Sequence, residues 1–398
     1  MSERTINMAV IGCGIIGEVH AWAVVKSGKA KLVCTCDIQP SRAEAFAKKY
    51  NCRAETDYRR VLADPSIDAI AIGTPHCEHT HIFLDAIKAG KHVICEKPLS
   101  TTPDNIYAMI DAAKKSPLVT TGVFQHRFSP ITSVIMKHLS AGALGKITGG
   151  SLTFQCRRAK EYYASDPWRG KWKFEGGGLL INQAIHTIDA LTLFFGKPVA
   201  VSGHVERRHM DTIEVEDFAE GVVEYQNGVK VKLLAENITE EKWDPTVRID
   251  GTGGSLTFAA AASHRVLSLT TKDASFRPEL DKAELEEKAL FTSAPGKQEY
   301  GSFHDLQFMD FINAVIEGRR ARYEIESMSI ANEIVLGLYH ATATGKRTEF
   351  PISGYKQPEL PLTPKKTAAA KKSKTALKKK PVQRQTSRGA KRASSRKR

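Results

Sequence analysis

Residues 8–17 read MAVIGCGIIG, an apolar run that leads directly into three glycines. The run predicts a buried strand, and a helix is expected after the glycines, through Val25. Gly12 permits a tight turn, Gly14 lets the backbone approach a pyrophosphate, and Gly17 allows close packing of helix on strand. A dinucleotide pyrophosphate is therefore predicted to bind the N–H groups of the loop formed by Gly12, Cys13, Gly14, Ile15, Ile16 and Gly17.

An acidic residue follows the glycine loop at the spacing expected for ribose recognition. Asp37 lies twenty residues beyond Gly17, at the end of the next predicted strand. A carboxylate there can accept hydrogen bonds from the ribose hydroxyls and repels a 2′-phosphate, so NAD is predicted as the cofactor, with NADP as the alternative. Arg42 could instead attract that phosphate, or could lie in solvent on the helix that begins near Ser41.

The chain divides into two regions of different pattern and a tail. Over residues 1–124, β-branched runs alternate with amphipathic stretches, which predicts an α/β domain with a doubly wound parallel sheet and its ligand crevice at the carboxyl strand ends. Strands are expected at 7–11, 31–36, 69–72, 92–95 and 119–122. Residues 125–352 predict a second α/β domain with a mostly antiparallel sheet, strands at 148–156, 199–207, 217–225 and 229–236, and helices at 303–317 and 327–344. Asn227-Gly228 predicts a two-residue hairpin.

Composition places most of the chain among ordinary folded proteins. Apolar residues make up 41% and charged residues 26% of 398 residues, which excludes a wholly disordered or fibrous chain. Of the net charge of +14, residues 363–398 hold fifteen Lys and Arg and no acid, which leaves 43 basic against 44 acidic residues elsewhere. A basic, disordered tail is predicted over 353–398, with order ending near Pro361. It could contact nucleic acid or another polyanion, or serve only as a solubilising or targeting extension.

The remaining sequence signals favour the cytoplasm. Seven cysteines without paired spacing are expected to be reduced thiols. The N-terminal residues offer no apolar segment typical of a secretion signal, and no run reaches the length that a membrane span requires. A cytoplasmic protein without membrane contact is therefore expected.

Two further segments hold candidate catalytic residues. Lys97 follows the predicted strand 92–95, so its ammonium group is expected at the carboxyl edge of the sheet, where it either acts on a substrate oxygen or lies in solvent. In the apolar segment after Gly176-Gly177-Gly178, a helix would place Asn182, His186 and Asp189 on one stripe. His186 is either a hydrogen-bonded core residue or a general base for a hydroxyl proton.

In these motifs the sequence resembles the Gfo/Idh/MocA oxidoreductases from about Met8 to Pro351. The resemblance is carried by the glycine loop, Gly73-Thr74-Pro75 with His79, Gly90-Lys91-His92-Val93 before Glu96-Lys97-Pro98, and the triple glycine with His186 and Asp189. It implies a Rossmann domain, a second domain that binds substrate, and homodimers or homotetramers formed through its open sheet. It also implies a cis Lys97–Pro98 bond.

The resemblance assigns roles to individual residues. Lys97 and His186 would flank the reacting carbon, with the nicotinamide side lined by Thr74, Pro75, His79 and Glu96. Many members have Asp where this chain has Asn182, which can orient the substrate or the imidazole but cannot take a proton.

Arg127 either binds substrate or holds the domain hinge. Substrate contacts are expected from Asn182, Asp189 and an aromatic and basic segment that contains Tyr162, Tyr163, Trp168, Arg169, Lys171 and Trp172. Alternatively, one or both tryptophans of this segment pack in the core. No metal is expected, because the spacing of His76, Cys77, His79, His81 and Cys95 is poor for one.

Three functions fit these observations. The leading hypothesis is NAD(P)-dependent oxidation of a secondary alcohol in a sugar, glycoside, sugar acid or cyclitol, or the reverse reduction. A second is glycoside cleavage through transient oxidation. A third is a dinucleotide-sensing regulator without catalysis, which the basic tail suggests and the presence of Lys97 and His186 opposes.

Overall fold

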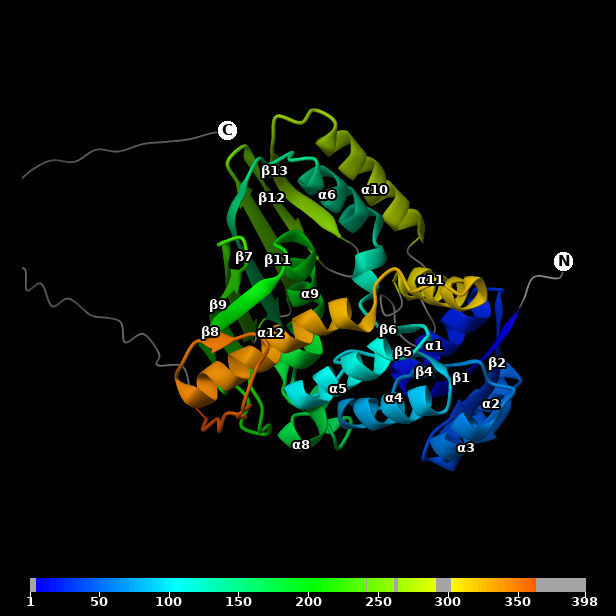
Figure 1. Cartoon of the computed structure of the whole chain (residues 1–398). Helices are drawn as coiled ribbons and strands as arrows, with labels where there is room; N and C mark the ends of the chain where they lie inside the picture. The colour runs from blue at the N-terminus through cyan, green and yellow to red at the C-terminus, as the bar shows by residue number, and fades with distance from the viewer. Residues whose placement is uncertain (1–4, 239, 241, 261–263, 291–301, 363–398) are drawn as a thin grey trace, which may run out of the picture. The chain divides into compact units, whose positions relative to one another are not determined.

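The computed structural model describes residues 5–238, 240, 242–260, 264–290 and 302–362. In these residues two sheets form, each with its own helices (Figure 1). The first sheet is built from apolar runs, such as β4 (Ala69–Ile72), all of whose residues are buried. Such runs suit parallel strands covered on both faces.

The N-terminal sheet has six strands, all parallel, in the order β3-β2-β1-β4-β5-β6. The five predicted strands are confirmed. β3 was not predicted, because a three-residue strand is too short to show a pattern. The remaining strands are β1 (Ile6–Ile11), β2 (Ala30–Cys36), β3 (Arg53–Glu55), β5 (His92–Cys95) and β6 (Thr120–Gly122).

Helices from two distant parts of the chain cover this sheet. Those between its strands are α1 (Ile15–Lys26), α2 (Pro40–Tyr50), α3 (Tyr58–Ala63), α4 (His79–Lys88) after the 3₁₀ turn η1 (His76–Glu78), and α5 (Pro103–Lys114). Helix α11 (His304–Glu317) joins them from far along the chain (Figure 1). Its Phe308 and Phe311 share a buried apolar cluster with Met8 of β1 and Ala21 of α1. Residues that follow the second sheet in the sequence therefore complete the core of the N-terminal sheet.

The second sheet has eight strands in the order β13-β12-β11-β7-β10-β9-β8-β14. Only β7 and β10 pair in parallel, so the predicted mostly antiparallel sheet is confirmed. Strands β11 to β14 widen it beyond the four predicted runs. The strands are β7 (Ile147–Cys156), β8 (Pro198–Glu206), β9 (Phe218–Tyr225), β10 (Lys230–Asn237), β11 (Trp243–Gly251), β12 (Gly254–Ala259), β13 (Arg265–Thr270) and β14 (Thr348–Glu349).

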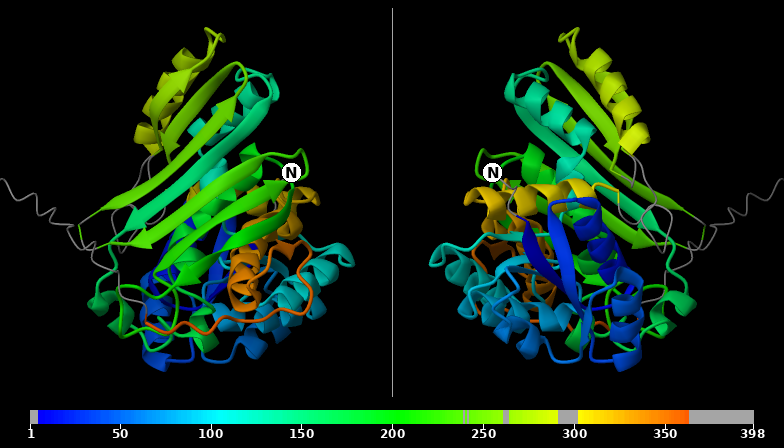
Figure 2. Two further views of the ribbon diagram at one scale, coloured as in Figure 1. Left: turned by 90° about the vertical axis from the view of Figure 1, so that its left-hand side faces the viewer. Right: turned by 90° about the vertical axis from the view of Figure 1, so that its right-hand side faces the viewer.

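Helices pack against one face of the second sheet. Helices α6 and α10 lie side by side (Figure 1), and the ring of His138 stacks on Phe276 with centroids 4.3 Å apart. In the left view of Figure 2 the other face of the sheet is turned toward the viewer, and no helix of the described residues covers it. The helical elements of this part are η2 (Gln125–Phe128), α6 (Pro130–Ser140), α7 (Lys160–Ala164), α8 (Trp172–Glu175), α9 (Ile185–Phe194), α10 (Phe276–Leu290) and α12 (Ile325–Thr344).

The predicted hairpin at Asn227-Gly228 joins β9 and β10, but its loop has three residues. Val231 pairs with Val223, and the N–H of Tyr225 donates to the carbonyl of Val229 (2.9 Å). Gly228 has a φ of +82°, the left-handed conformation that ends the common three-residue hairpin loop.

The stretch that precedes the basic residues packs on the folded part of the chain. Tyr355 stacks on His340 with ring centroids 6.2 Å apart, and Leu362 forms a parallel bridge with Arg207. Residues 353–362, which the predicted tail includes, thus contact the second domain. Residues 363–398, and with them the predicted polyanion contact, lie outside the described residues. Among the helices that are described, none has the length and apolar character needed to cross a membrane.

Candidate active site

The glycine loop has the geometry that the three predicted glycine roles require. Gly12 has a φ of +100°, and a Cβ there would lie 2.5 Å from the carbonyl oxygen of Gly73. A Cβ on Gly17 would lie 1.9 Å from the carbonyl oxygen of Gly12, so the helix packs against the turn itself. Around Gly14, by contrast, no atom lies within 4 Å of a Cβ position. This free space, at the N-terminus of α1, is where a pyrophosphate could approach the backbone.

Asp37 lies beside the loop at the end of β2. One carboxylate oxygen accepts a hydrogen bond from the N–H of Cys13 (2.9 Å), and the other accepts one from the N–H of Gln39 (2.9 Å). In the glycine loop beside it, the side chain of Ile15 is 47% exposed. The side chain of Asp37 is only partly buried. Its position next to the loop therefore fits the predicted ribose contact.

The Gly73-Thr74-Pro75 turn is tied to the segment of Lys97 by one histidine. The ring of His79 is buried, and its nitrogens contact the carbonyl oxygens of Pro98 (2.7 Å) and Thr74 (2.9 Å). The Lys97–Pro98 bond is cis, as predicted. Among the described residues, the buried hydroxyl of Thr74 has no hydrogen-bond partner. A buried hydroxyl usually has one, so Thr74 and Pro75 fit a surface that a dinucleotide completes.

The side chain of Glu96 binds the backbone N–H of Lys97. One carboxylate oxygen contacts the imidazole of His20 (3.0 Å), and the other accepts from the N–H of Lys97 (3.0 Å). Burial raises the pKa of Glu96, but hydrogen bonds to His20 and His304 outweigh it and hold the pKa well below its usual value. Glu96 is 4% exposed, so it supports Lys97 more directly than it lines the crevice.

Lys97 reaches across to the second half of the chain. Its ammonium group donates to the backbone oxygen of Asn182 (2.8 Å) and to the side-chain oxygen of the same residue (3.2 Å). Loss of surrounding water lowers the pKa of Lys97 to about 8, although Glu96 opposes this shift. The lysine is thus poised to exist in both protonation states near neutral pH.

The segment of His186 is not one regular helix. Residues Leu179–Ala184 form a π-helix, and α9 starts at Ile185. The wider turn changes the spacing between Asn182 and the other two residues, a correction to the single α-helical stripe that was predicted. His186 and Asp189 both lie on α9, where His186 is partly exposed and Asp189 is buried.

His186 is the one partly exposed residue in a buried run. Residues 181–185 and 187–189 are buried. Its ring lies against those of Phe124 (centroids 5.7 Å apart) and His126 (5.5 Å), and its buried Nδ1 has no partner among the described residues. Burial, and then the charge of Lys97, lower the pKa of His186 to about 3. The imidazole is therefore neutral at ordinary pH and close enough to Lys97 to respond to its charge.

Two parts of the chain match one known protein family. Residues 6–123 match the Gfo/Idh/MocA profile, described as an oxidoreductase family with an NAD-binding Rossmann fold, and residues 134–257 match the C-terminal domain of the same family. D-glucoside 3-dehydrogenase of Escherichia coli is 31% identical over 247 residues, 57% of this chain and 69% of that protein. The chain belongs to the Gfo/Idh/MocA family. The predicted enzyme class and NAD cofactor are thereby confirmed.

Two other proteins extend the comparison. Levoglucosan dehydrogenase of Pseudarthrobacter phenanthrenivorans is 30% identical over 215 residues, 50% of this chain and 53% of that protein. The solved structure of the WlbA dehydrogenase from Bordetella pertussis, in complex with NADH and UDP-GlcNAcA, superposes with a TM-score of 0.81 at 23% identity. It covers 89% of this chain and 100% of that one. At that identity the superposition shows the shared fold.

Two residues predicted to bind substrate instead bind each other in this Gfo/Idh/MocA protein. Arg127 and Asp189 form a two-point ion pair (2.6 and 2.8 Å) and are each 2% exposed. Arg127 also donates to the hydroxyl and carbonyl oxygens of Ser327 at the start of α12. These bonds occupy the guanidinium group and leave it no access to the crevice. We therefore assign the pair to the hinge, the alternative that the sequence left open for Arg127.

Trp172 is also held by the protein itself. Its indole N–H donates to the backbone oxygen of Glu214 (2.9 Å), and its ring packs edge-on against Tyr339 with centroids 5.1 Å apart. Trp168 lies nearer to the turn of η1, with its ring centroid 5.0 Å from that of His76. Of the two tryptophans, Trp168 is the better candidate for a substrate contact.

Sequence reasoning did not identify Glu175. This fully buried carboxylate ends α8 and accepts hydrogen bonds from the side chain of Asn182 and from the N–H of Gly170. Burial raises its pKa to about 7, although these bonds and the charges of Arg169 and Lys97 oppose the shift. Its place next to Gly176-Gly177-Gly178 was the only available signal. Lys97, Asn182 and Glu175 thus form one hydrogen-bonded chain.

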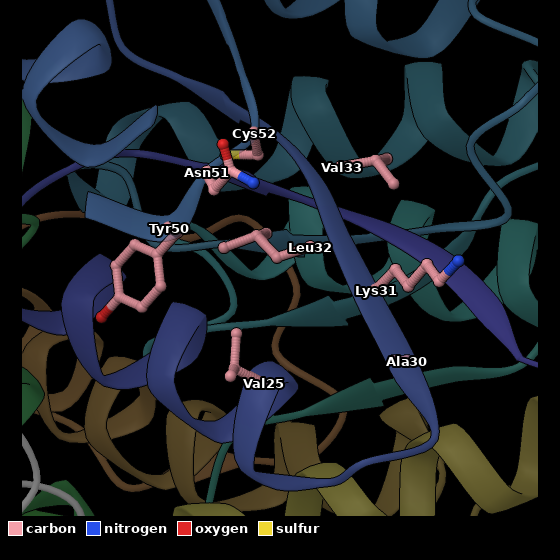
Figure 3. A pocket seen from close by; sticks show the side chains of 8 residues that line it. All are labelled: Val25, Ala30, Lys31, Leu32, Val33, Tyr50, Asn51 and Cys52. Carbon is pink, nitrogen blue, oxygen red and sulfur yellow. The ribbon is translucent and has the colours of Figure 1, made fainter. Parts of the chain in front are cut away.

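A surface groove elsewhere on the N-terminal domain does not belong to this site. Figure 3 shows its lining, which includes Val25, Leu32, Tyr50 and Cys52. None of the predicted site residues lines it. It borders the start of β2, whereas ligands of doubly wound sheets bind at the carboxyl ends of the strands. Among the described residues no cluster of histidine, cysteine or acidic side chains could hold a metal ion.

Proposed function

We propose that this enzyme transfers a hydride between NAD and a secondary alcohol or ketone of a sugar, glycoside, sugar acid or cyclitol. The observation that carries the proposal is the contact between Lys97 and the segment that contains His186. Lys97, from the N-terminal sheet, bonds to Asn182 on the second half of the chain, and its charge acts on His186 four residues further on. Two relatives whose names specify carbohydrate dehydrogenases, of D-glucosides and levoglucosan, support the substrate class.

The cofactor would be held by residues whose geometry already suits it. The N–H groups around Gly14 would bind the pyrophosphate and Asp37 the ribose, while Thr74 and Pro75 would contact the nicotinamide half. His79 and Glu96 would keep these segments in place. NAD, when bound, supplies the acceptor for a hydride from the alcohol carbon. NADP is disfavoured because its 2′-phosphate would face the carboxylate of Asp37.

The acid-base chemistry would fall to His186 and Lys97. The neutral imidazole of His186 can accept the hydroxyl proton as the hydride leaves the same carbon. Lys97 would donate a hydrogen bond to the substrate oxygen and stabilise the charge that develops on it. Asn182 cannot take a proton, so its oxygens would fix the direction of the Lys97 ammonium group. In the reverse direction, the same groups would return the proton to the carbonyl oxygen.

Two further parts of the proposal concern the setting of the enzyme. We place it in the cytoplasm, because all seven cysteines are unpaired thiols, five of them buried. We also propose a homodimer or homotetramer formed through the open face of the second sheet (Figure 2). Size-exclusion chromatography with light scattering tests this assembly, and a monomer at working concentrations would contradict it.

A substrate panel tests the reaction. Sugars, glycosides, sugar acids and inositols would be incubated with NAD or NADP, and NADH formation followed by absorbance. We expect turnover with NAD for at least one class. Lys97→Ala and His186→Ala should each lower kcat by at least about 10³-fold and leave NADH binding, measured by nicotinamide fluorescence, nearly unchanged.

The alternatives give different results in the same panel. Cleavage of a glycoside without net NADH formation would favour the transient-oxidation mechanism. Binding of NADH without turnover of any class would favour a regulator. If the two variants lose NADH binding together with activity, the roles assigned to Lys97 and His186 are wrong.

A further inference from the structure

Arg158 is a cation close to the reaction centre whose charge the proposed mechanism does not use. It follows β7, and its backbone N–H donates to the side chain of Asn237 at the end of β10 (2.7 Å). Its guanidinium donates to the side-chain oxygen of Gln183 (2.8 Å), the neighbour of Asn182 in the π-helix. The charges of both Arg158 and Arg169 help to lower the pKa of Lys97, so the three cations lie near one another.

Two aromatic rings hold the Arg158 side chain in place. Its guanidinium carbon lies 4.8 Å from the ring centre of Tyr162 and 4.6 Å from that of Trp243. Stacking between aromatic faces fixes the plane of a guanidinium group. The group is therefore already oriented before any ligand binds.

No carboxylate of the described residues pairs with Arg158, in contrast to Arg169, which faces Asp166 (3.4 Å). The Nε atom of Arg158 is buried and has no hydrogen-bond partner among them. Arg158 as a whole is only partly buried, and its guanidinium group carries five N–H donors. Among the described residues, its guanidinium group donates to the amide oxygen of Gln183 alone, which leaves further donors for a ligand.

The surroundings also contain more donors than acceptors. The hydroxyl oxygen of Tyr162 accepts from the side chains of Asn182 (3.2 Å), Gln183 (2.7 Å) and Arg169. The buried carboxylate of Glu175 already accepts from Asn182 and Gly170. Among the described residues, Arg169 thus has Asp166 and Lys97 has Glu96 as nearby acids, whereas Arg158 has no ion-paired carboxylate.

From this arrangement we infer that the substrate is a sugar or polyol that carries a carboxylate, and that Arg158 binds this carboxylate. The planar guanidinium fork matches the two oxygens of a carboxylate, and such pairs are among the stronger hydrogen-bonded contacts in proteins. The inference rests on the proposed function, because it names the substrate class of the same site.

Matched substrates test it. Methyl α-D-glucopyranoside, the corresponding glucuronoside and the corresponding 6-phosphate differ only at the sixth carbon. We expect the glucuronoside to have a kcat/KM at least roughly tenfold above that of the neutral glycoside. Preference for the phosphate over the glucuronoside would overturn the assignment of a carboxylate.

Variants of Arg158 separate binding from structure. Arg158→Gln should lower kcat/KM for the glucuronoside by about 10²-fold, mainly through KM, whereas the KM of the neutral glycoside should change by less than roughly threefold. Arg158→Lys should restore part of the loss. Arg59→Gln, which removes an exposed charge on α3, is the control and should have no effect. Equal losses for both substrates would show a purely structural role and overturn the inference.

A binding measurement distinguishes failure of this inference from failure of the proposed function. Affinity for the glucuronoside would be measured on the NADH complex by nicotinamide fluorescence, in the native enzyme and in Arg158→Gln. Turnover of neutral sugars alone, without affinity for the acid, overturns the inference and leaves the proposed function intact. Affinity for the acid that Arg158→Gln abolishes, without turnover of any sugar, supports the inference as a binding site and contradicts the proposed function.

Discussion

The ammonium group of Lys97 lies 2.8 Å from the backbone oxygen of Asn182 and 3.2 Å from its side-chain oxygen. This contact joins the carboxyl edge of the N-terminal sheet to the π-helix of the second domain. It is a contact between residues 85 positions apart in the chain. The protonation state and direction of Lys97 therefore depend on both domains.

The first prediction concerns the pH dependence of alcohol oxidation. Because the pKa of Lys97 is lowered to about 8, we expect the rate to fall as pH rises through an inflection near that value. Above it, Lys97 is neutral and no longer stabilises the charge that develops on the substrate oxygen. Asn182→Asp places a carboxylate beside the ammonium group, which favours its charged form and should move the inflection upward by about one unit or more.

The control for this profile is Lys97→Arg, whose side chain stays charged at every accessible pH. Its residual activity should show no inflection near the native position. An unchanged inflection in Lys97→Arg, or a downward shift in Asn182→Asp, would assign the titration to another group.

The second prediction concerns Gly14. Because a Cβ there meets no atom within 4 Å and φ is −90°, Gly14→Ala should fold with nearly native stability. The added methyl group would occupy the space expected for the pyrophosphate, so NAD affinity should fall by roughly tenfold or more. Titration calorimetry and thermal unfolding measure the two effects. Gly17→Ala is the contrasting variant and should lose stability first, because its Cβ would overlap Gly12.

The third prediction concerns the choice of dinucleotide. Asp37→Asn removes the charge that would repel a 2′-phosphate but keeps an oxygen that can accept from Cys13. We expect the ratio of kcat/KM for NAD to that for NADP to fall by about tenfold, equivalent to about 1.4 kcal/mol. Arg42→Gln should leave the NAD values unchanged. A ratio that stays constant in Asp37→Asn would remove Asp37 from the ribose site.

The fourth prediction concerns stability and Glu175. Its pKa is about 7 in the folded protein and near 4.5 when unfolded. Between these values the folded state binds more protons than the unfolded state, so the contribution to stability decreases as pH rises through this window. Glu175→Gln removes the dependence and should gain up to about 3 kcal/mol relative to the native protein between ~pH 5 and ~pH 8.

Urea unfolding at the two ends of that range measures the difference between native protein and variant. The comparison within each pH cancels the titration of the other acidic groups. If native protein and Glu175→Gln respond alike to pH, Glu175 is ionised in the folded state and its raised pKa is refuted.

The amino-acid sequence by itself determined the N-terminal fold and half of the site. The glycine loop and Asp37 act through local backbone geometry and fixed spacing along a strand, turn and helix, so they can be recognised without coordinates. The strands of the first sheet could be predicted for the same reason, because strands buried on both faces are continuous apolar runs. Lys97 was identified because a strand end fixes which edge of a parallel sheet it occupies.

Only the tertiary structure decided the partners of the remaining residues. Arg127 and Asp189 bind each other, Glu175 connects to Lys97 through Asn182, and Arg158 lacks an acidic partner among the described residues. Each of these relationships joins side chains whose distance depends on how two sheets pack, which no local pattern encodes. The π-helix at Leu179–Ala184 also depends on this packing, because regular α-helical hydrogen bonding is locally preferred over the wider turn. Local backbone preferences thus specified where the nucleotide site forms, and long-range packing specified which charges meet there.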